Sequence, residues 1–179
     1  KQNLQEKGIY LPVITTLHGT DITLVGKHPS YRPAVTFSIN QSDIVTTVSE
    51  SLKKDTLSSF VIKKEIEVIP TFIDIKLYDK DPLCDRTQMA PQGEKIVVHI
   101  SNMRKVKRIP DIIEAFHKIQ EVIPTILLMI GEGPECELAE QQAKDLGIFH
   151  RVKFLGKTSE IKRLLCMSDL FLLPSETES

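Results

Sequence analysis

The sequence predicts an α/β fold with parallel β-sheets, and three observations support this prediction. Short runs rich in β-branched residues alternate along the chain with stretches of helical period, as in strand–helix–strand units with right-handed crossovers. Most of these runs are continuously apolar, which suits strands that are buried on both faces of a sheet. The alternation stops between residues 70 and 94. We therefore expect two α/β units joined by a linker.

Seven runs predict the strands. They combine β-branched and long aliphatic side chains, and most lack the strict alternation of a strand that is half exposed to water. The predicted strands cover residues 13–16, 44–48, 66–69, 96–100, 126–130, 152–155 and 170–173.

Four helices are predicted between these strands. Ser49 can cap the first helix, and the second repeats apolar residues at helical spacing from Ile109 onward. The third has Pro134 at its first position and Gly147 just past its end, and the fourth follows Ser159. The apolar positions of the first, second and fourth helices are Leu52, Leu57, Phe60, Ile112, Ile113, Phe116, Ile119, Ile161, Leu164 and Leu165.

The segment between residues 70 and 94 predicts a linker. It contains three prolines, a glycine and a charged run at residues 79–81, with little periodicity. A long surface loop within one sheet is the alternative, but loops beyond about 12–15 residues are uncommon in compact domains. The linker is the favoured interpretation.

The composition excludes several classes of protein. Apolar residues make up 41% and charged residues 26% of the chain, as in ordinary globular proteins rather than disordered tails. The 23 basic and 24 acidic residues give a net charge of -1, so a basic footprint over the whole surface, for nucleic acid or an anionic membrane, is not expected, while a local basic patch stays open. No run approaches the length of about 18 apolar residues that predicts a membrane span.

The cysteines and the two ends add two expectations. Cys84, Cys136 and Cys166 are odd in number and far apart, which favours thiols in a reducing compartment over disulfides. The chain opens at Lys1 without a methionine and stops at Ser179 shortly after an apolar run. We therefore expect an internal fragment of a longer protein.

A cationic segment follows the predicted strand 96–100. Residues 101–108 read Ser-Asn-Met-Arg-Lys-Val-Lys-Arg, and four of the last five are cations just ahead of a helix that begins near Pro110. Cations at a helix N-terminus are unfavourable by about 0.3–1 kcal/mol each, so their presence is more easily explained if an anion binds there. Several converging cations favour a diphosphate. The alternative is a solvated basic loop.

Two glycines follow the predicted strand 126–130. Gly131 and Gly133, in the sequence Gly-Glu-Gly-Pro, would let a ligand approach the backbone closely, or would simply form a good turn. The third glycine of a dinucleotide fingerprint and the lysine of a Walker motif are both missing. A dinucleotide-binding enzyme and an ATPase are therefore disfavoured.

Polar residues also follow the first and last predicted strands. His18 lies in the sequence Leu-His-Gly-Thr-Asp and can donate to a substrate hydroxyl or phosphate, although a lone histidine is often structural. The carboxylates of Glu176 and Glu178 could accept hydrogen bonds from sugar hydroxyls, or could belong to a solvated turn. The five histidines show no metal-ligand spacing, so no metal site is expected.

Taken in their order along the chain, the loops that follow the predicted strands resemble those of the retaining glycosyltransferases of family 4. The resemblance extends over almost the whole chain. Within the family, the loops are most similar to those of members that transfer N-acetylglucosamine from its UDP carrier to L-malate in bacillithiol biosynthesis. It rests on residues 17–21, 45–49, 101–108, 131–134, 154–156 and 174–178.

The resemblance implies the B-type fold of two facing Rossmann-like units, with the chain cut at both ends. Residues 1–75 would complete the acceptor unit, residues 76–93 would form the linker, and residues 94–179 would begin the unit that binds the nucleotide sugar. A fragment of this kind is not expected to catalyse by itself.

On the donor side, the resemblance implies a catalytic role for Lys107, which matches the lysine that stabilises the leaving diphosphate. Asn102 stands where the family has an arginine, and Arg104 or Arg108 would replace that arginine. Glu178 matches the first glutamate of the Glu–seven residues–Glu motif, which holds the donor sugar. Other donor contacts would come from Gly131 and Gly133.

On the acceptor side, the resemblance implies that His18 is an active-site residue near the transferred sugar. Thr20 and Arg32 would contact the acceptor, with Arg32 pairing with its carboxylates. In such retaining transfers the leaving phosphate itself takes the acceptor proton, so the protein needs cations and hydrogen bonds rather than a base.

The same resemblance implies the partners and the location. They are a UDP-sugar as substrate and a small hydroxy acid as acceptor, without a cofactor or a metal, in the cytoplasm. The oligomeric state stays open, and a homo-oligomer is compatible with the sequence. The alternatives are a family 4 enzyme with a different acceptor and a non-catalytic α/β module that binds phosphorylated metabolites.

Overall fold

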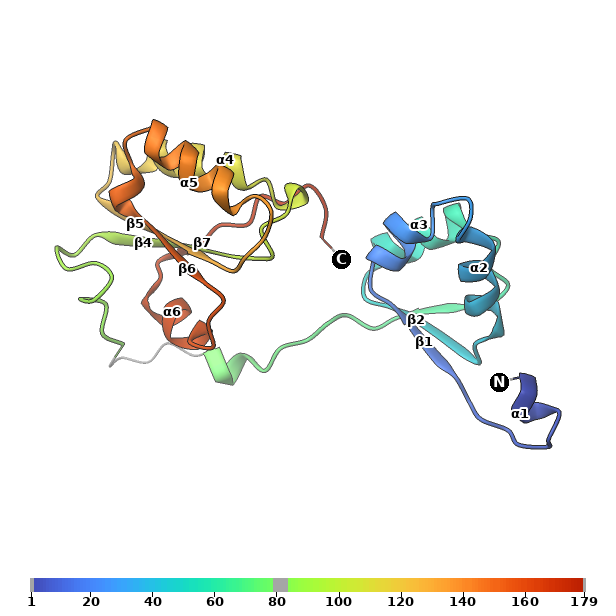
Figure 1. Cartoon of the computed structure of the whole chain (residues 1–179). Coiled ribbons are helices and arrows are strands. Elements are labelled where there is room, and N and C mark those ends of the chain that lie inside the picture. The colour runs from blue at the N-terminus through green and yellow to red at the C-terminus, as the bar shows by residue number, and fades with distance from the viewer. Residues whose placement is uncertain (1, 79–83, 179) are drawn as a thin grey trace. The chain divides into compact units, whose positions relative to one another are not determined.

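The computed structural model describes residues 2–78 and 84–178 of the chain and divides it into two compact units. The first extends to Ile73 and the second runs from Asp74 to Glu178. Each unit has its own parallel sheet (Figure 1). The α/β class with parallel sheets is confirmed.

The first unit contains a three-stranded sheet in the order β1-β2-β3, with both pairs parallel. All three predicted strands of this unit are present. Its core gathers apolar residues from the sheet and from the helices that follow the strands. The elements are α1 (Gln2–Gln5), β1 (Ile14–Leu17), the π-helical turn η1 (Asp21–Val25), α2 (Arg32–Gln41), β2 (Ile44–Thr47), α3 (Glu50–Ser59) and β3 (Ile66–Val68).

The two longer helices of this unit differ in how well the sequence predicts them. In α3 the cap is confirmed, because the Oγ of Ser49 accepts a hydrogen bond from the N–H of Leu52 at 3.2 Å. Leu52 and Phe60 are buried, but Leu57 is 49% exposed, so its predicted place in the apolar face is wrong. Helix α2 was not predicted, since it is rich in β-branched residues and weakly amphipathic.

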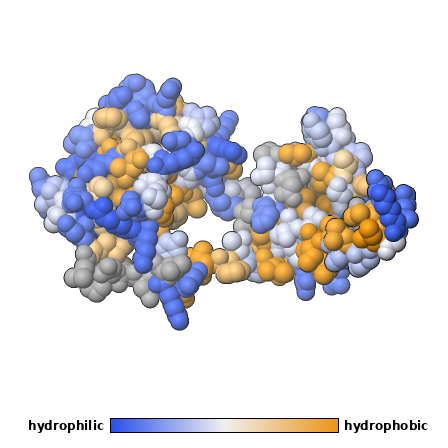
Figure 2. Space-filling model, turned by 60° about the horizontal axis from the view of Figure 1, so that its bottom comes forward, coloured by the Kyte–Doolittle hydropathy of each residue, from blue (hydrophilic) through white to orange (hydrophobic). Residues whose placement is uncertain are grey.

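The edge of the first sheet exposes apolar side chains. Strand β1 lies at one end of the strand order. Figure 2 shows hydrophobic surface on the unit formed by the N-terminal residues. Apolar side chains along a strand edge mark a surface suited to further contacts. The exposed residues just before and within β1 are Ile9, Tyr10, Leu11 and Ile14.

The second unit contains a four-stranded parallel sheet in the order β6-β5-β4-β7. Helices α4 and α5 cover one face of this sheet and α6 covers the other (Figure 1). The elements are η2 (Ile75–Tyr78), β4 (Lys95–Ile100), η3 (Lys105–Lys107), α4 (Ile109–Gln120), β5 (Thr125–Ile130), α5 (Cys136–Asp145), η4 (Phe149–Arg151), β6 (Val152–Gly156), α6 (Ile161–Met167) and β7 (Leu170–Phe171).

The burial of the second sheet agrees with its apolar runs. All six residues of β5 are buried, with alternate side chains packing into the cores on the two faces. Helix α5 starts at Cys136, two residues later than predicted, because Pro134 lies in the turn that precedes it. The chain leaves α5 through Gly147 at φ +72°, as predicted for a C-terminal glycine.

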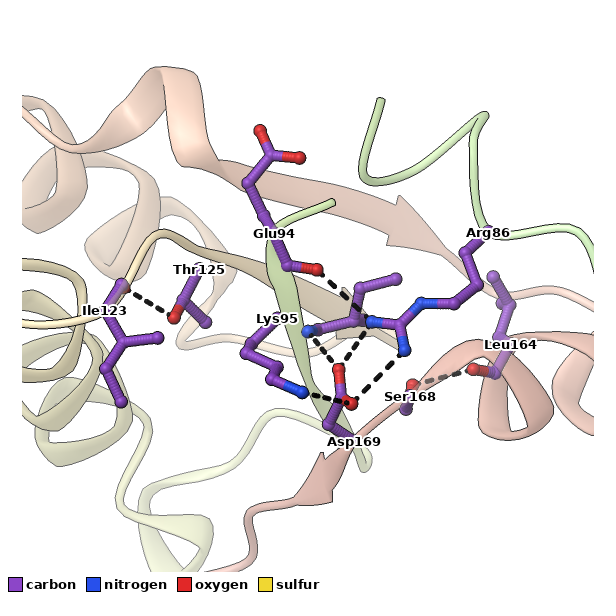
Figure 3. A network of polar contacts seen from close by, with 9 residues as sticks. Arg86, Glu94, Lys95, Ile123, Thr125, Leu164, Ser168 and Asp169 are labelled. Carbon is purple, nitrogen blue, oxygen red and sulfur yellow. Dashed lines mark hydrogen bonds and ion pairs between the residues drawn. The ribbon is translucent and has the colours of Figure 1, made fainter. Parts of the chain in front are cut away.

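The segment ahead of β4 is bound to the second unit through Asp169 (Figure 3). The guanidinium of Arg86 donates to both carboxylate oxygens of Asp169, at 2.5 and 3.2 Å. The same carboxylate accepts from the N–H of Ile96 at 2.8 Å and from the ammonium of Lys95 at 3.4 Å. These bonds fix the start of β4 beside the start of β7.

The hydrogen bonds from Arg86, partly opposed by burial, lower the pKa of Asp169 to about 2. The carboxylate is thus ionised at neutral pH. No helix among the described residues is long and apolar enough to cross a membrane.

Replacing Asp169 with asparagine should lower the free energy of unfolding by about 1–2 kcal/mol, because it removes a charged group that accepts four hydrogen bonds. Solvent around the partly exposed Arg86 keeps this loss small. Urea unfolding measures this change. Because the pKa is depressed in the folded state, the difference from the wild type should narrow as the pH falls from 3.8 towards about 2. The control is Glu114→Gln, which breaks a solvent-exposed pair with Lys118 and should cost clearly less than the loss of Asp169. Equal losses in the two variants would contradict the role of Asp169.

Candidate functional site

The candidate site lies beyond the carboxyl ends of β4 and β7, which are neighbours in the second sheet. Ligands of open parallel sheets bind at this edge. The segment after β4 covers residues 101–108, and the segment after β7 covers residues 172–178. The two are joined by a backbone hydrogen bond, in which the N–H of Glu176 donates to the carbonyl of Val106 at 2.9 Å.

Lys107 and Glu178 form an ion pair at this junction. The ammonium of Lys107 donates to Oε1 of Glu178 at 2.5 Å, although the two residues are 71 positions apart in the sequence. The Lys107 side chain is only 16% exposed, whereas that of Glu178 is 48% exposed. Burial raises the pKa of Glu178, but the hydrogen bond and charge of Lys107 outweigh it, and the pKa lies below its ordinary value. The carboxylate of Glu178 is therefore ionised at neutral pH.

The other cations of this segment have different surroundings. Arg108 is the N-cap of α4, at φ +53°, and its Nε donates to Asp111 in the first turn at 2.6 Å. That hydrogen bond raises the pKa of Arg108. Arg104 and Lys105 are exposed. A cation at this helix N-terminus is therefore less unfavourable at Arg108 than the sequence suggests, because Asp111 offsets its charge.

The glycines after β5 make room for another loop. A Cβ at Gly131, which has φ +117°, would lie 1.9 Å from the carbonyl oxygen of Ser101. A Cβ at Gly133 would lie 2.3 Å from the carbonyl oxygen of Met103. The N–H of Met103 also donates to the carbonyl of Glu132 at 3.0 Å. The close approach predicted at these glycines is thus a contact with the segment 101–103, and contact with a donor stays a prediction.

His99 lies in β4, just before the segment 101–108, and was not among the residues predicted for the site. Its side chain is fully buried in β4 and contacts Ser101 and Leu172, the residues from which the two segments start. Burial lowers the pKa of His99, so the imidazole is neutral at pH 7. A histidine inside a continuous apolar run needs buried hydrogen-bond partners, and this is the signal that could have identified it.

The structure gathers the predicted donor residues in the second unit. Lys107 and Glu178 meet directly, and Asn102, which is exposed, lies in the same segment as Arg104 and Arg108. Gly131 and Gly133 adjoin that segment. Their roles towards a donor remain predictions.

The predicted acceptor residues belong to the first unit. His18 and Thr20 are exposed just past the carboxyl end of β1, where Gly19, at φ +122°, turns the chain. The carbonyl of Gly19 accepts from the N–H of Thr23 at 2.7 Å, at the start of the helical turn η1. Arg32 is the first residue of α2, and its guanidinium donates to the carbonyl of Ser59.

Among residues 2–78 and 84–178, no group of three or more His, Cys, Asp or Glu side chains is placed to hold a metal ion. The independence from metals and cofactors stays a prediction.

Family models match both units. The model described as glycosyl transferases group 1 matches residues 85–179, more than half of the chain, and the model described as Glycosyltransferase Family 4 matches residues 7–77. The chain therefore belongs to the group 1 glycosyl transferases, a family in keeping with the parallel sheets and with the loops at their carboxyl ends.

Individual curated proteins of known description are also similar to this chain. The chain is 45% identical to the N-acetyl-alpha-D-glucosaminyl L-malate synthase of Bacillus anthracis, over 100% of this chain and 47% of the relative. It is 27% identical to a GDP-mannose-dependent alpha-(1-6)-phosphatidylinositol monomannoside mannosyltransferase of Mycolicibacterium smegmatis, over 92% of this chain and 44% of that protein. The chain thus spans about half the length of the curated relatives it matches.

Solved structures share the fold. The Anabaena protein HepE, in complex with UDP and glucose, matches with a TM-score of 0.77 at 22% identity, over 93% of this chain and 47% of that one. A glycosyltransferase from Rickettsia africae matches with a TM-score of 0.73 at 21% identity, over 99% of this chain and 49% of that one. These matches agree with the α/β fold with parallel sheets that the sequence predicts.

Replacing Gly131 with alanine should destabilise the second unit far more than the same change at Gly147. Both glycines have positive φ, which costs an alanine about 1–2 kcal/mol in the left-handed region of Gly147 and at least as much at Gly131. At Gly131 the new Cβ would also overlap the Ser101 carbonyl, whereas at Gly147 nothing lies within 4 Å. We expect an additional loss of about 2 kcal/mol or more in urea unfolding. Similar losses at both positions would show that the loops do not pack as described.

Proposed function

We propose that the full-length protein containing this chain is a retaining glycosyltransferase that moves N-acetylglucosamine from UDP-N-acetylglucosamine to L-malate. The observation that carries the proposal is the meeting of Lys107 and Glu178 beyond β4 and β7, in a chain that is 45% identical along its whole length to an N-acetylglucosaminyl L-malate synthase.

Lys107 would stabilise the leaving group. As the bond between the sugar and the diphosphate breaks, negative charge grows on the phosphate oxygens, and a fixed cation nearby favours that change. The Lys107 side chain is largely buried and held by a hydrogen bond, so its charge is weakly screened and well positioned. Arg104 and Arg108 in the same segment would add positive charge around the diphosphate.

Glu178 would hold the sugar. An ionised carboxylate accepts hydrogen bonds and donates none, which suits the hydroxyl groups of a sugar. Because Glu178 lies within one hydrogen bond of Lys107, a ligand with a diphosphate joined directly to a sugar fits this pair: the anion at the ammonium and the polyol at the carboxylate.

The first unit would bind the acceptor. Malate carries two carboxylates and one hydroxyl, and Arg32 has further guanidinium N–H donors besides the one used by Ser59. Thr20 and His18 would supply hydrogen bonds to the acceptor and the transferred sugar. The leaving phosphate would take the proton of the malate hydroxyl, so the reaction needs no separate base.

The proposal places the protein in the cytoplasm and requires no metal or cofactor. The three cysteines are odd in number and far apart in the sequence, which favours a reducing compartment. Lys107 and its neighbours would supply the positive charge that a divalent cation supplies in other enzymes that act on diphosphates.

Replacing Lys107 with alanine in the full-length protein should lower kcat/KM for UDP-N-acetylglucosamine by about 100-fold or more, the usual cost of removing one group that stabilises transition-state charge. Initial rates of UDP release in the presence of L-malate measure this. The control is Lys118→Ala on the outer side of α4, which should stay within about threefold. A Lys107 variant as active as the control would refute the assigned role.

A panel of acceptors distinguishes the proposal from its main rival. The 27% identity to a mannosyltransferase with a different donor and acceptor favours, as a second candidate, a family member that uses another acceptor. We expect L-malate to be glycosylated faster than other hydroxy acids and than lipid acceptors. Preference for another acceptor would support the rival, and binding of UDP-N-acetylglucosamine without transfer or hydrolysis would favour a non-catalytic binding protein.

A further inference from the structure

His99 has no part in the proposed chemistry, yet it lies directly beneath the proposed site. It belongs to β4, and its side chain has an exposed fraction of 0%. A fully buried imidazole is costly unless its two nitrogens have partners.

Both ring nitrogens of His99 have partners, and these lie on different segments of the chain. Nδ1 is 2.9 Å from the carbonyl oxygen of Leu172, just past β7. Nε2 is 2.7 Å from the hydroxyl of Ser101, just past β4. A carbonyl oxygen can only accept, so Nδ1 carries the proton, and in the neutral ring Nε2 accepts from Ser101.

Among the described residues, several contacts hold the two segments together, and those of the imidazole lie at the ends of the strands. Further out, the N–H of Glu176 donates to the carbonyl of Val106 at 2.9 Å. Furthest out, Lys107 pairs with Glu178. The separation of the segments at their base therefore sets where the two charged side chains meet.

We propose that His99 is a positioning residue, whose ring spaces the segments after β4 and β7 so that Lys107 and Glu178 converge on the nucleotide sugar. The inference rests on the proposed function, and it adds to that function a buried residue that acts through Ser101 and Leu172. Misplacement of a reacting group by about 1 Å can cost about 100-fold in rate, so small changes at His99 should reach the chemistry.

Three variants of the full-length protein test the proposal. Ser101→Ala removes one hydroxyl, and Ser101→Thr keeps it. His99→Asn keeps a donor near Leu172 but cannot also reach Ser101. We expect Ser101→Ala and His99→Asn to lower kcat/KM about 10- to 100-fold and the affinity for UDP about tenfold, because Lys107 is displaced. Ser101→Thr should restore both quantities to within about threefold of the wild type.

The pH dependence gives a second readout. Within the described residues, the charged groups that act on His99 are Lys107, which opposes protonation, and Glu178, which favours it. Protonation of the ring would place a second cation beside Lys107. We expect the acid side of the wild-type kcat profile to contain a protonation step, below the ordinary pKa of histidine, that His99→Asn lacks.

The control is His117→Asn, which removes another imidazole of the same unit, on α4, and should leave UDP affinity and kcat/KM within about threefold. If His99→Asn and Ser101→Ala lower the melting temperature but bind UDP as tightly as the wild type, His99 is only a structural residue and the inference is overturned. If the wild type transfers sugar to no acceptor, the proposed function fails. The affinity for UDP then still tests the positioning role of His99. His99→Asn and Ser101→Ala should again lose about tenfold in this affinity, and unchanged affinity would overturn the inference.

Discussion

The pairing of β7 beside β4 is the constraint on which the candidate site depends. These strands are far apart in the sequence but adjacent in one parallel sheet, so their carboxyl ends release the chain at the same edge. Lys107 and Glu178, 71 positions apart, meet there because of this topology. The bonds of Asp169 at the opposite ends of the strands support the same pairing, since its carboxylate accepts from the N–H of Ile96 and its own N–H donates to the carbonyl of Ile96. The site is thus a consequence of strand order.

Close packing of loops is the second condition. Gly131 and Gly133 let the segment after β5 lie against the backbone of residues 101–103, and the bond from the N–H of Gly131 to the carbonyl of Gly156 extends the contact to the end of β6. The cationic segment is therefore supported by β5 on one side and by β7 on the other. A support of this kind limits the movement of Lys107, which is what electrostatic stabilisation of a leaving group requires.

Much of the fold could be predicted from the sequence, because apolar runs and helix ends are local signals. All seven strands and the cap at Ser49 follow from such signals. Helix α2 does not, since its β-branched residues have low helix propensity and its apolar residues form only a weak stripe. Asn102 to Arg108 could be recognised as a cationic segment. The partners of its charges could not, because Glu178 reaches Lys107 only through strand order. The need of His99 for buried partners could have been inferred from its place in an apolar run, but the identity of one partner could not, since Leu172 lies just past β7.

The affinities of UDP and UDP-N-acetylglucosamine for Lys107→Ala and Glu178→Gln, measured by calorimetry on the full-length protein, test the account most directly. If Lys107 binds the diphosphate and Glu178 the sugar, the lysine variant should lose affinity for both ligands. The glutamate variant should lose affinity for the nucleotide sugar alone, and should bind UDP at least as tightly as the wild type, because its Lys107 no longer has a competing carboxylate. Unchanged UDP affinity in Lys107→Ala would contradict the account.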